Sequence, residues 1–455
     1  MVKYFTSLEC HFFRYAAEFI TNHARIRRHS RLHAWFKVGV VTLAEMKAFF
    51  AVILNMGLIK KATISEYWNT KYKSQETKWF RKMFSRNWFQ LILKFFHLVD
   101  NDSLPQRNSP NYSPTDKFQC IIDHFNIQSS RHLVPEQNMS IDESLIATRG
   151  RSVMLQYIPS KSAKFGVKCW MLVEATSGYL YRMIVNRGKR FDPTPQGVCQ
   201  GSYVVNRLLA AAGLLNKWYH IICDNFFTSL DLARQLFIQK THLTGTIRQN
   251  RQMPLMIKNP QIMENEFIYM RQGPILMCSY RERANRKPVR ILSSFCKASQ
   301  DNNNKPNILN FYNKNMGGVD MSDMMLTFYH SNRKSMKVWK KFVFNVLHRM
   351  VINAYVLYKK HSSERPLKSR LQFIQSVIED LAREHLDDKE EDEEPHGVDL
   401  VKIRLRKIPG GRQRECCVCS DRNGEGRRRA RTRCRRCDKG LHKDCIVNHN
   451  CVIES

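Results

Sequence analysis

The chain has 455 residues, enough for several domains, and its 74 Lys and Arg residues exceed its 40 Asp and Glu residues, which gives a formal net charge of +34. A charge of this size favours a polyanionic partner, because each neutralised phosphate releases bound counterions. Hydrophobic residues at 43% and aromatic residues at 11% exclude a disordered basic tail, since they suffice to build cores. A basic ribosomal or chromatin-associated protein has the same composition, so charge alone does not separate these classes from a DNA enzyme.

Neither a membrane-spanning helix nor a signal peptide is expected. The sequence has no run of about 18 or more apolar residues, so we expect no membrane partner. Residues 1–13 lack the apolar run and the cleavage site of a signal peptide. The cysteines up to Cys296 are scattered, as in reduced intracellular proteins, whereas half of the 14 cysteines lie between Cys416 and Cys451.

Residues 1–137 are predicted to be helical. Apolar residues recur at three- and four-residue spacing over 43–56, where Thr42 is the expected N-cap, and again over 88–98. Basic and aromatic residues around these segments fit either a solvated helix face or a DNA contact.

A change of character near Met139 marks the start of a mixed α/β region. The hydrophobic pattern predicts, in chain order, strands at 140–146, 167–174 and 179–185, a helix at 203–218, a strand at 220–223, a helix at 230–239 and a strand at 242–247. A turn signal at residues 175–178 makes the second and third strands a hairpin. Three strands followed by alternating helix and strand is the order of an RNase H-like domain.

Beyond residue 247 the pattern changes again. Three strand-like segments between residues 266 and 295 predict an all-β insertion over 248–306. A helix is expected over 308–329 and a long amphipathic helix over 335–360, before an acidic linker at 387–394. The predicted core stripe of the long helix comprises Trp339, Phe342, Val343, Leu347, Met350, Ala354 and Leu357.

Four aspartates lie where a two-metal phosphodiesterase site needs acids. Such a site requires acidic ligands that converge on two cations roughly 3.5–4 Å apart, and Mg²⁺ or Mn²⁺ takes such hard oxygen ligands. In an RNase H-like sheet one acid lies on the first strand, a second at the end of the neighbouring fourth strand, and a third on a later helix. The acids at these places are Asp142, Asp224 and Asp320, with Asp323 three residues further on.

An acid inside an apolar strand is costly unless it is paired or metal-bound, so Asp142 has two interpretations. It is either a metal ligand or a carboxylate in a salt bridge with Arg149 or Arg151. Glu143 is a rival ligand, although strand alternation should point it to the other face. Two strand-placed acids at matching positions, in a chain of charge +34, favour the metal site.

The C-terminal cluster has the spacing of zinc ligands. Pairs of cysteine or histidine residues, separated by one or two positions, recur four times between residues 416 and 451. Such pairs close tetrahedral Zn²⁺ sites, and four in series predict a cross-brace with two ions, the first pair joining the third and the second joining the fourth. The predicted zinc ligands are Cys416, Cys419, Cys434, Cys437, His442, Cys445, His449 and Cys451. A disulfide framework is the alternative, and Cys417 is either a spare thiol or an alternative ligand.

The sequence blocks around the aspartates carry a family resemblance. They read Ser140-Ile-Asp-Glu-Ser-Leu145, Arg149-Gly-Arg151, Tyr157-Ile-Pro159, Lys164-Phe-Gly-Val-Lys168, Cys223-Asp-Asn-Phe-Phe-Thr-Ser229, Leu243-Thr-Gly-Thr-Ile-Arg248, and Tyr312-Asn-Lys-Asn-Met-Gly-Gly-Val-Asp320 with Ser322-Asp323. In this order the blocks resemble those of piggyBac transposases, over essentially the whole chain. The acidic N-terminal extension common in that family has no counterpart here, which would make the chain a shortened product or a fragment.

The resemblance implies a function. It implies that Asp142, Asp224 and Asp320 are the catalytic triad and that Asp323 is a fourth active-site carboxylate. The implied reaction nicks transposon ends, forms hairpins over TTAA overhangs and transfers strands into a TTAA target. The implied partners are double-stranded DNA, as transposon ends and TTAA target, and a second copy of the chain in a nuclear homodimer. The terminal cross-brace would bind transposon-end DNA.

The expected fold class is α/β and multidomain, with an RNase H-like core, an all-β insertion, a flanking helical domain and a C-terminal zinc cross-brace. The expected parts are 1–137 and 330–385, a split helical dimerisation and DNA-binding domain; 138–247 and 307–329, the split RNase H-like catalytic core; 248–306, the β-rich insertion; 386–413, an acidic then basic linker; and 414–455, the cysteine-rich zinc-binding domain.

Two other classes of function remain open at this point. A domesticated, transposase-derived DNA-binding or chromatin protein without transposition activity can retain every carboxylate. A chromatin or ubiquitin adaptor that acts through the cross-brace is a weaker hypothesis, because it does not explain the three ordered carboxylate blocks.

Overall fold

The computed structural model describes residues 41–159, 161, 163–331, 335–393, 405–420, 426, 428–434, 437–445 and 449. The chain divides into two units, Met1–His385 and Leu386–Ser455. The helices predicted within residues 1–40 lie outside the described residues. Within the described ranges, no helix is both long enough and apolar enough to cross a membrane.

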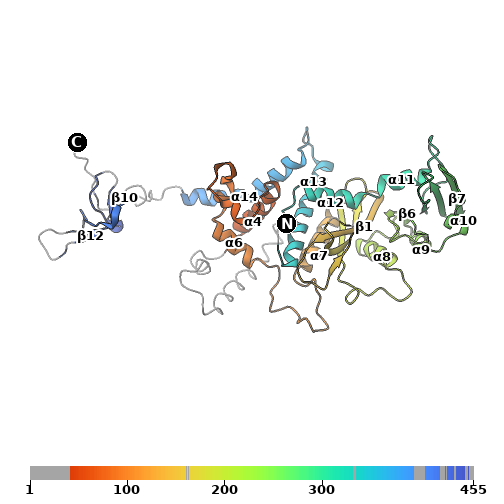
Figure 1. Cartoon of the computed structure of the whole chain (residues 1–455), viewed down its shortest axis with the longest axis horizontal. Helices are drawn as coiled ribbons and strands as arrows, with labels where there is room; N and C mark the ends of the chain where they lie inside the picture. The colour runs from red at the N-terminus through yellow and green to blue at the C-terminus, as the bar shows by residue number, and fades with distance from the viewer. Residues whose placement is uncertain are drawn as a thin grey trace. The chain divides into compact units, whose positions relative to one another are not determined.

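The first unit contains a mixed sheet, nine-stranded over the described residues, which runs from the strands around β1 to β7 (Figure 1). Its order is β2-β3-β1-β5-β6-β9-β8-β7, and β4 pairs with β3 off this path. The strands are β1 (Asn138–Ala147), β2 (Leu155–Tyr157), β3 (Phe165–Glu174), β4 (Leu180–Val185), β5 (His220–Cys223), β6 (His242–Thr246), β7 (Glu266–Gln272), β8 (Ile275–Arg281) and β9 (Val289–Ser293). The helical elements of this unit are α4 (Leu43–Leu58), η2 (Ile64–Trp68), η3 (Lys73–Gln75), α5 (Lys78–Met83), α6 (Arg86–Phe95), α7 (Gln119–His132), α8 (Gln200–Ala212), α9 (Leu230–Ile238), α10 (Leu255–Lys258), α11 (Asn307–Asn315), α12 (Gly318–Phe328), α13 (Val338–His361) and α14 (Arg370–Glu393). The residues of α14 after His385 belong to the second unit.

The middle of this sheet has the topology of an RNase H-like core. β1 pairs antiparallel with β3 on one side and parallel with β5 on the other, and β5 pairs parallel with β6. The β3–β4 hairpin turns through Gly178, whose φ of +73° favours glycine. Helix α8 connects β4 to β5 and α9 connects β5 to β6, and both contribute apolar residues to one core with β1, β3, β5 and β6. The predicted RNase H-like fold is confirmed.

Strands β7, β8 and β9 of the predicted insertion continue this same sheet. β9 pairs antiparallel with β6, β8 with β9, and β7 with β8. Buried residues of β8 and β9 pack with those of α11 in a second core cluster, which also includes Ile222 of β5. The insertion therefore shares the hydrogen-bond ladder of the core instead of forming a separate sheet.

Helices from the two ends of the first unit pack together beside the sheet. α4 begins at Thr42, which forms the capping box that its sequence predicts. In α14, the Nε2 atom of His385 lies 2.8 Å from the carbonyl oxygen of Met83, and its ring stacks on Phe84 at 4.8 Å between centroids. Gly57 of α4 approaches the backbone after α12, because a Cβ atom there would lie 2.2 Å from the carbonyl oxygen of Tyr329.

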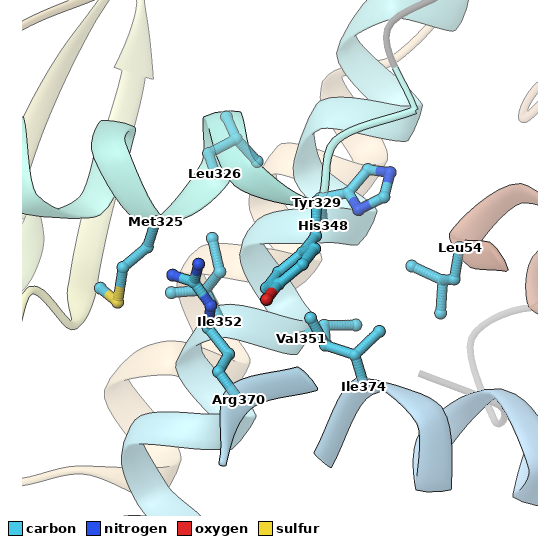
Figure 2. A pocket seen from close by; sticks show the side chains of 9 residues that line it. All are labelled: Leu54, Met325, Leu326, Tyr329, His348, Val351, Ile352, Arg370 and Ile374. Carbon is cyan, nitrogen blue, oxygen red and sulfur yellow. The ribbon is translucent and has the colours of Figure 1, made fainter. Parts of the chain in front are cut away.

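A small cavity lies where α4, α12, α13 and α14 meet (Figure 2). Its volume of about 20 Å³ is room for about one water molecule, so it is no site for a nucleotide. The lining residues are Leu54, Met325, Leu326, Tyr329, His348, Val351, Ile352, Arg370 and Ile374.

Three helix predictions need correction. The single helix expected over 308–329 is two helices, because the chain turns at Met316 and Gly317 to lay α12 against β1. The acidic run expected to be a linker continues α14 as far as Glu393, since its Glu, Asp and Lys residues tolerate a helix that α14 has already nucleated. The core stripe predicted for the long helix, now α13, is partly wrong. Its member Ala354 is exposed, and α13 instead buries several polar residues that were not part of the predicted stripe.

The second unit is a small pair of two-stranded sheets. Its elements are β10 (Leu405–Lys407), η4 (Pro409–Gly411), β11 (Arg414–Glu415), β12 (Arg429–Ala430), β13 (Thr432–Cys434) and η5 (Lys443–Cys445). β10 pairs with β13, and β11 pairs with β12. Its apolar cluster contains Leu405, Ala430 and Leu441 together with cysteines, which is too small a core to fold by burial alone.

Candidate active site and metal centres

Asp142, within β1, and Asp224, directly after the end of β5, lie at matching positions of two neighbouring parallel strands. The β1–β5 register ends with the residue pair immediately before these two aspartates. Asp142 Oδ1 accepts a hydrogen bond from the amide of Glu143 at 2.7 Å, and Asp224 Oδ1 accepts one from the amide of Phe226 at 2.9 Å. Main-chain donors therefore orient both carboxylates at the same edge of the sheet.

Both carboxyl groups have raised pKa values. The pKa of Asp142 is raised to about 7, first by burial and then by the negative charges of Glu143 and Asp224, against the opposing effects of the Glu143 amide and of Lys161. Burial also raises the pKa of Asp224, with Glu143 adding to the rise and Arg248 opposing it. A bound divalent cation would offset both the burial and the repulsion, so this donor set fits Mg²⁺ or Mn²⁺.

The salt bridge considered for Asp142 is not found. All three residues are described, and no ion pair within 4.0 Å joins Asp142 to Arg149 or Arg151. Glu143, expected on the other face of β1, forms an ion pair with Lys161 at 3.8 Å, and its charge still raises the pKa of both aspartates.

Asp320 lies on the helix that crosses β1 beside Asp142. Ser140 Oγ donates to a carbonyl just before α12 at 2.9 Å, and Ser144 Oγ donates to Asp323 Oδ1 at 2.9 Å. Residues 140, 142 and 144 share one face of the strand, so Asp142 faces the side that α12 covers. Asp320 is exposed in the first turn of α12, between these two contacts along the helix.

Asp323 is engaged differently from the other three aspartates. Its Oδ1 accepts from Arg349 Nη2 at 2.6 Å as well as from Ser144. The Arg349 side chain is only 1% exposed, whereas that of Asp323 is 34% exposed, so the pair joins a buried cation to a half-buried carboxylate. The structure thus brings Asp142 and Asp224 together, sets Asp320 on the adjoining helix, and joins Asp323 to an arginine.

Basic and aromatic side chains to which the sequence analysis assigned no role surround Asp142 and Asp224. Arg248 Nε donates to Asn225 Oδ1 at 2.9 Å, and its guanidinium lies 5.7 Å from the ring centre of Phe226. Lys168 lies 5.5 Å from the same ring centre and 4.6 Å from that of Trp170. A ring between two cations, two residues after Asp224, can contact a phosphate and a base together.

The second unit gathers the predicted zinc ligands into two groups. Ligand atoms of Cys416, Cys419, His442 and Cys445 lie within 4.8 Å of one another, and so do those of Cys434, Cys437 and His449. The first pair therefore meets the third, and the second meets the fourth, which is the grouping that a cross-brace predicts. Cys451, the predicted eighth ligand, lies outside the described residues.

The thiols of the first group lie close enough to influence each other's pKa values, and a bound cation would offset the repulsion between their thiolates. Burial raises the pKa of Cys416, but backbone amides of His442 and Val418 outweigh it and bring the value down to about 6. Cys419 and Cys416 raise the pKa of Cys445 to about 12. Sulfur and imidazole ligands in fours suit Zn²⁺. Cys417 stands apart from both groups, although its Sγ lies 3.4 Å from His449 Nδ1.

Comparison with known proteins identifies the family. A family model described as Transposase IS4 matches residues 20–355. Human PiggyBac transposable element-derived protein 3 is 23% identical over 93% of this chain and 73% of its own length. Human PiggyBac transposable element-derived protein 2 is 24% identical over 72% of this chain, which spans 57% of that protein.

The fold also matches a solved structure. The cryo-EM structure of a piggyBac transposase synaptic complex with hairpin DNA aligns with a TM-score of 0.74 and 22% identity, covering 95% of this chain and 91% of that chain. Such a likeness, at this identity, establishes a common fold. The family match, the human relatives and this common fold show that the chain belongs to the piggyBac family of transposases and transposable element-derived proteins.

Proposed function

We propose that the chain is a cut-and-paste DNA transposase, a divalent-metal-dependent nuclease and strand transferase that acts at transposon ends and TTAA targets. The observation that carries the proposal is the register that sets Asp142 and Asp224 at matching positions of two neighbouring strands, with the pKa of both carboxyl groups raised by burial and by neighbouring negative charge. Structural carboxylates are usually paired with a cationic side chain, whereas among the described residues neither of these two has an ion pair within 4.0 Å.

Asp142, Asp224 and Asp320 would hold the Mg²⁺ or Mn²⁺ ions. When bound, two such ions activate the attacking oxygen and stabilise the leaving oxygen of a phosphodiester. The backbone amides of Glu143 and Phe226 keep the two strand carboxylates oriented towards that site. Asp323, one helical turn from Asp320, borders the same site.

The basic surfaces would hold DNA. Lys168 and Arg248 flank Phe226 next to Asp224, where they would contact the phosphates of the strand to be cut. In the second unit, Arg428, Arg429 and Arg431 are exposed, and with two Zn²⁺ bound this unit would read the transposon end. We propose a homodimer, since an insertion has two ends to cut, and the nucleus as its site of action, since its substrate is chromosomal DNA.

The test is an excision assay in cells, with matched terminal repeats flanking a marker at TTAA. Wild type is compared with Asp224→Asn, which keeps the size and the hydrogen bonding of the side chain but removes the charge that would bind metal. Scarless excision by wild type and none by the variant supports the proposal. Excision by both would show that Asp224 does not hold a metal.

A domesticated DNA-binding protein without transposition activity is the second candidate. The names of the human relatives describe proteins derived from transposable elements, and these proteins are similar in sequence to this chain. Absence of excision by wild type, with binding of DNA that Mg²⁺ does not influence, would favour this second function.

A further inference from the structure

One fully buried arginine joins three elements around the carboxylate site. Arg349 of α13 donates from Nη2 to Asp323 Oδ1 at 2.6 Å and to Ser144 Oγ at 3.2 Å, and from Nη1 to Ser322 Oγ at 3.2 Å. Its Nε donates to Asn345 Oδ1 at 2.9 Å, one turn back on the same helix. The guanidinium thus has acceptors on β1, α12 and α13.

These acceptors lie next to the predicted metal ligands. Ser144 is two residues from Asp142 on the same face of β1, and Asp323 is one helical turn from Asp320 on α12. Ser144 also donates to Asp323 Oδ1 at 2.9 Å, so a single carboxylate oxygen receives both the strand hydroxyl and the guanidinium. The network therefore fixes where α12 lies along β1.

A buried guanidinium needs a counter-ion. Arg349 is 1% exposed, and the carboxylate it contacts is that of Asp323, whose side chain is 34% exposed. A bidentate or networked arginine holds its partners in one geometry more rigidly than a lysine can. The remaining contacts of Arg349 are neutral hydroxyl and amide oxygens, so Asp323 supplies the balancing charge.

We propose that Arg349 is a positioning residue for the carboxylate site, and that Asp323 is its counter-ion and not a metal ligand. This rests on the proposed function, in which Asp142 and Asp320 hold divalent cations. Arg349 acts by locking α12 against β1, so that Asp320 is presented to the same site as Asp142. Asp323 then contributes to catalysis only through Arg349 and Ser144.

The experiment titrates Mn²⁺ into the zinc-loaded full chain by calorimetry and measures DNA-end cleavage as a function of Mn²⁺. The variants are Asp323→Asn, Arg349→Met, Arg349→Lys and the double variant Asp323→Asn/Arg349→Met, with Asp224→Asn as the control that removes a ligand. The double variant removes both charges together, so it leaves no unpaired buried charge if one of the single variants fails to fold.

Asp323→Asn is expected to keep the Mn²⁺ stoichiometry of wild type, whereas Asp224→Asn loses it. Arg349→Met is expected to raise the half-saturating Mn²⁺ concentration of the folded protein about 10-fold or more, the usual effect of losing a residue that orients a ligand. Arg349→Lys should recover part of that shift. The double variant should cleave faster than Arg349→Met alone, because the two charges act as a pair.

A loss of Mn²⁺ stoichiometry in Asp323→Asn like that in Asp224→Asn would overturn the counter-ion role. A half-saturating Mn²⁺ concentration in Arg349→Met equal to that of wild type would overturn the positioning role, even if the melting temperature falls. Wild type that neither binds Mn²⁺ beyond its zinc sites nor cleaves DNA would overturn the proposed function, and this inference with it.

Discussion

The carboxylate of Glu174, at the end of β3, is fully buried and receives the ammonium of Lys360, near the end of α13, at 2.8 Å and 3.0 Å. The two residues are 186 positions apart in the sequence. Glu174 also accepts from the amide of Glu136 at 2.9 Å and from the hydroxyl of Ser177. This pair fastens the far end of α13 to the sheet, as Arg349 does at its middle.

Lys360→Met is expected to lower the free energy of unfolding by about 3 kcal/mol, because it leaves the buried Glu174 carboxylate without a cation. The double variant Glu174→Gln/Lys360→Met should lose less unfolding free energy than Lys360→Met, since it removes both charges. Lys359→Met, which alters an exposed neighbour, is the matched control. Urea unfolding at pH 7 measures all four proteins, and equal losses for Lys360→Met and Lys359→Met would contradict the role of the pair.

The stability of the first unit should fall on acidification because of His348. Its Nε2 accepts from the amide and the hydroxyl of Ser331 at 3.2 Å and 2.8 Å, so the ring must stay neutral at that atom. Burial, with a smaller effect of His330, lowers the pKa of His348 to about 3. The unfolded chain binds this proton near pH 6.5 and the folded chain does not, so stability is lost as the pH falls from about 6.5 towards 3.

Between pH 7 and pH 5 this single residue should cost about 2 kcal/mol. His348→Gln retains an acceptor but does not titrate, so its unfolding free energy should change less over the same interval. Urea unfolding of wild type and variant at the two pH values gives the difference, which cancels the contributions of the other histidines. The same acid-induced loss in both proteins would show that His348 titrates normally.

Much of the core could be predicted because hydrophobic periodicity and turn signals act locally. β5 begins and ends at the predicted residues, and the β3–β4 hairpin and the capped start of α4 follow from their own sequences. The single helix predicted across α11 and α12 overlooks the local turn signal of Gly317 and Gly318. The sequence could not show that Ser140, 176 positions away, donates a hydrogen bond to the carbonyl of Met316 at this turn. A long-range contact of this kind leaves no periodic signal.

Some residues of the candidate site could likewise be predicted from the sequence, and others could not. Asp142 and Asp224 could be placed together from topology, and the cysteine groups from the spacing of their ligands. Arg349 could not be found, because an arginine within an amphipathic helix is expected to point to solvent. Its burial depends on Ser144, 205 positions away, and on Asp323, whose role the sequence alone assigned to the metal site.

Gly245→Ala should disturb the segment that carries Asp224. A Cβ atom at Gly245 would lie 2.2 Å from Thr228 Oγ1 and 2.5 Å from the carbonyl oxygen of Cys223, so the backbone beside Asp224 must move. We expect a loss of about 1–3 kcal/mol in unfolding free energy, together with slower DNA cleavage. Gly317→Ala, whose Cβ would meet no atom within 4 Å, is the control for stability. Urea unfolding and a cleavage assay decide, and equal stability of the two variants would refute the expected clash.

The zinc content of the chain should distinguish Cys419 from Cys417. Cys419 belongs to the first ligand group, whereas Cys417 lies outside both groups. Cys419→Ser is therefore expected to reduce the bound zinc from two ions to one, and Cys417→Ser to leave two. Elemental analysis of the purified proteins measures this. A loss of one ion in Cys417→Ser would instead make Cys417 a ligand in the group of His449, which its sulfur approaches at 3.4 Å.

Asp142→Asn should stabilise the fold while it abolishes cleavage. The folded-state pKa of Asp142, about 7, is above that of an unfolded aspartate, so the ionised carboxylate costs stability at pH 8 when no divalent cation is bound. The Asn side chain can still accept a hydrogen bond from the Glu143 amide but carries no charge, so we expect the unfolding free energy to rise by about 1–3 kcal/mol.

Thermal unfolding of the zinc-loaded wild type and Asp142→Asn at pH 8, without and with Mn²⁺, measures this gain in stability. Saturating Mn²⁺ should stabilise wild type alone and so remove the advantage of the variant. A variant less stable than wild type in the absence of Mn²⁺ would mean that Asp142 is a structural carboxylate, whose charge the fold already balances without a metal.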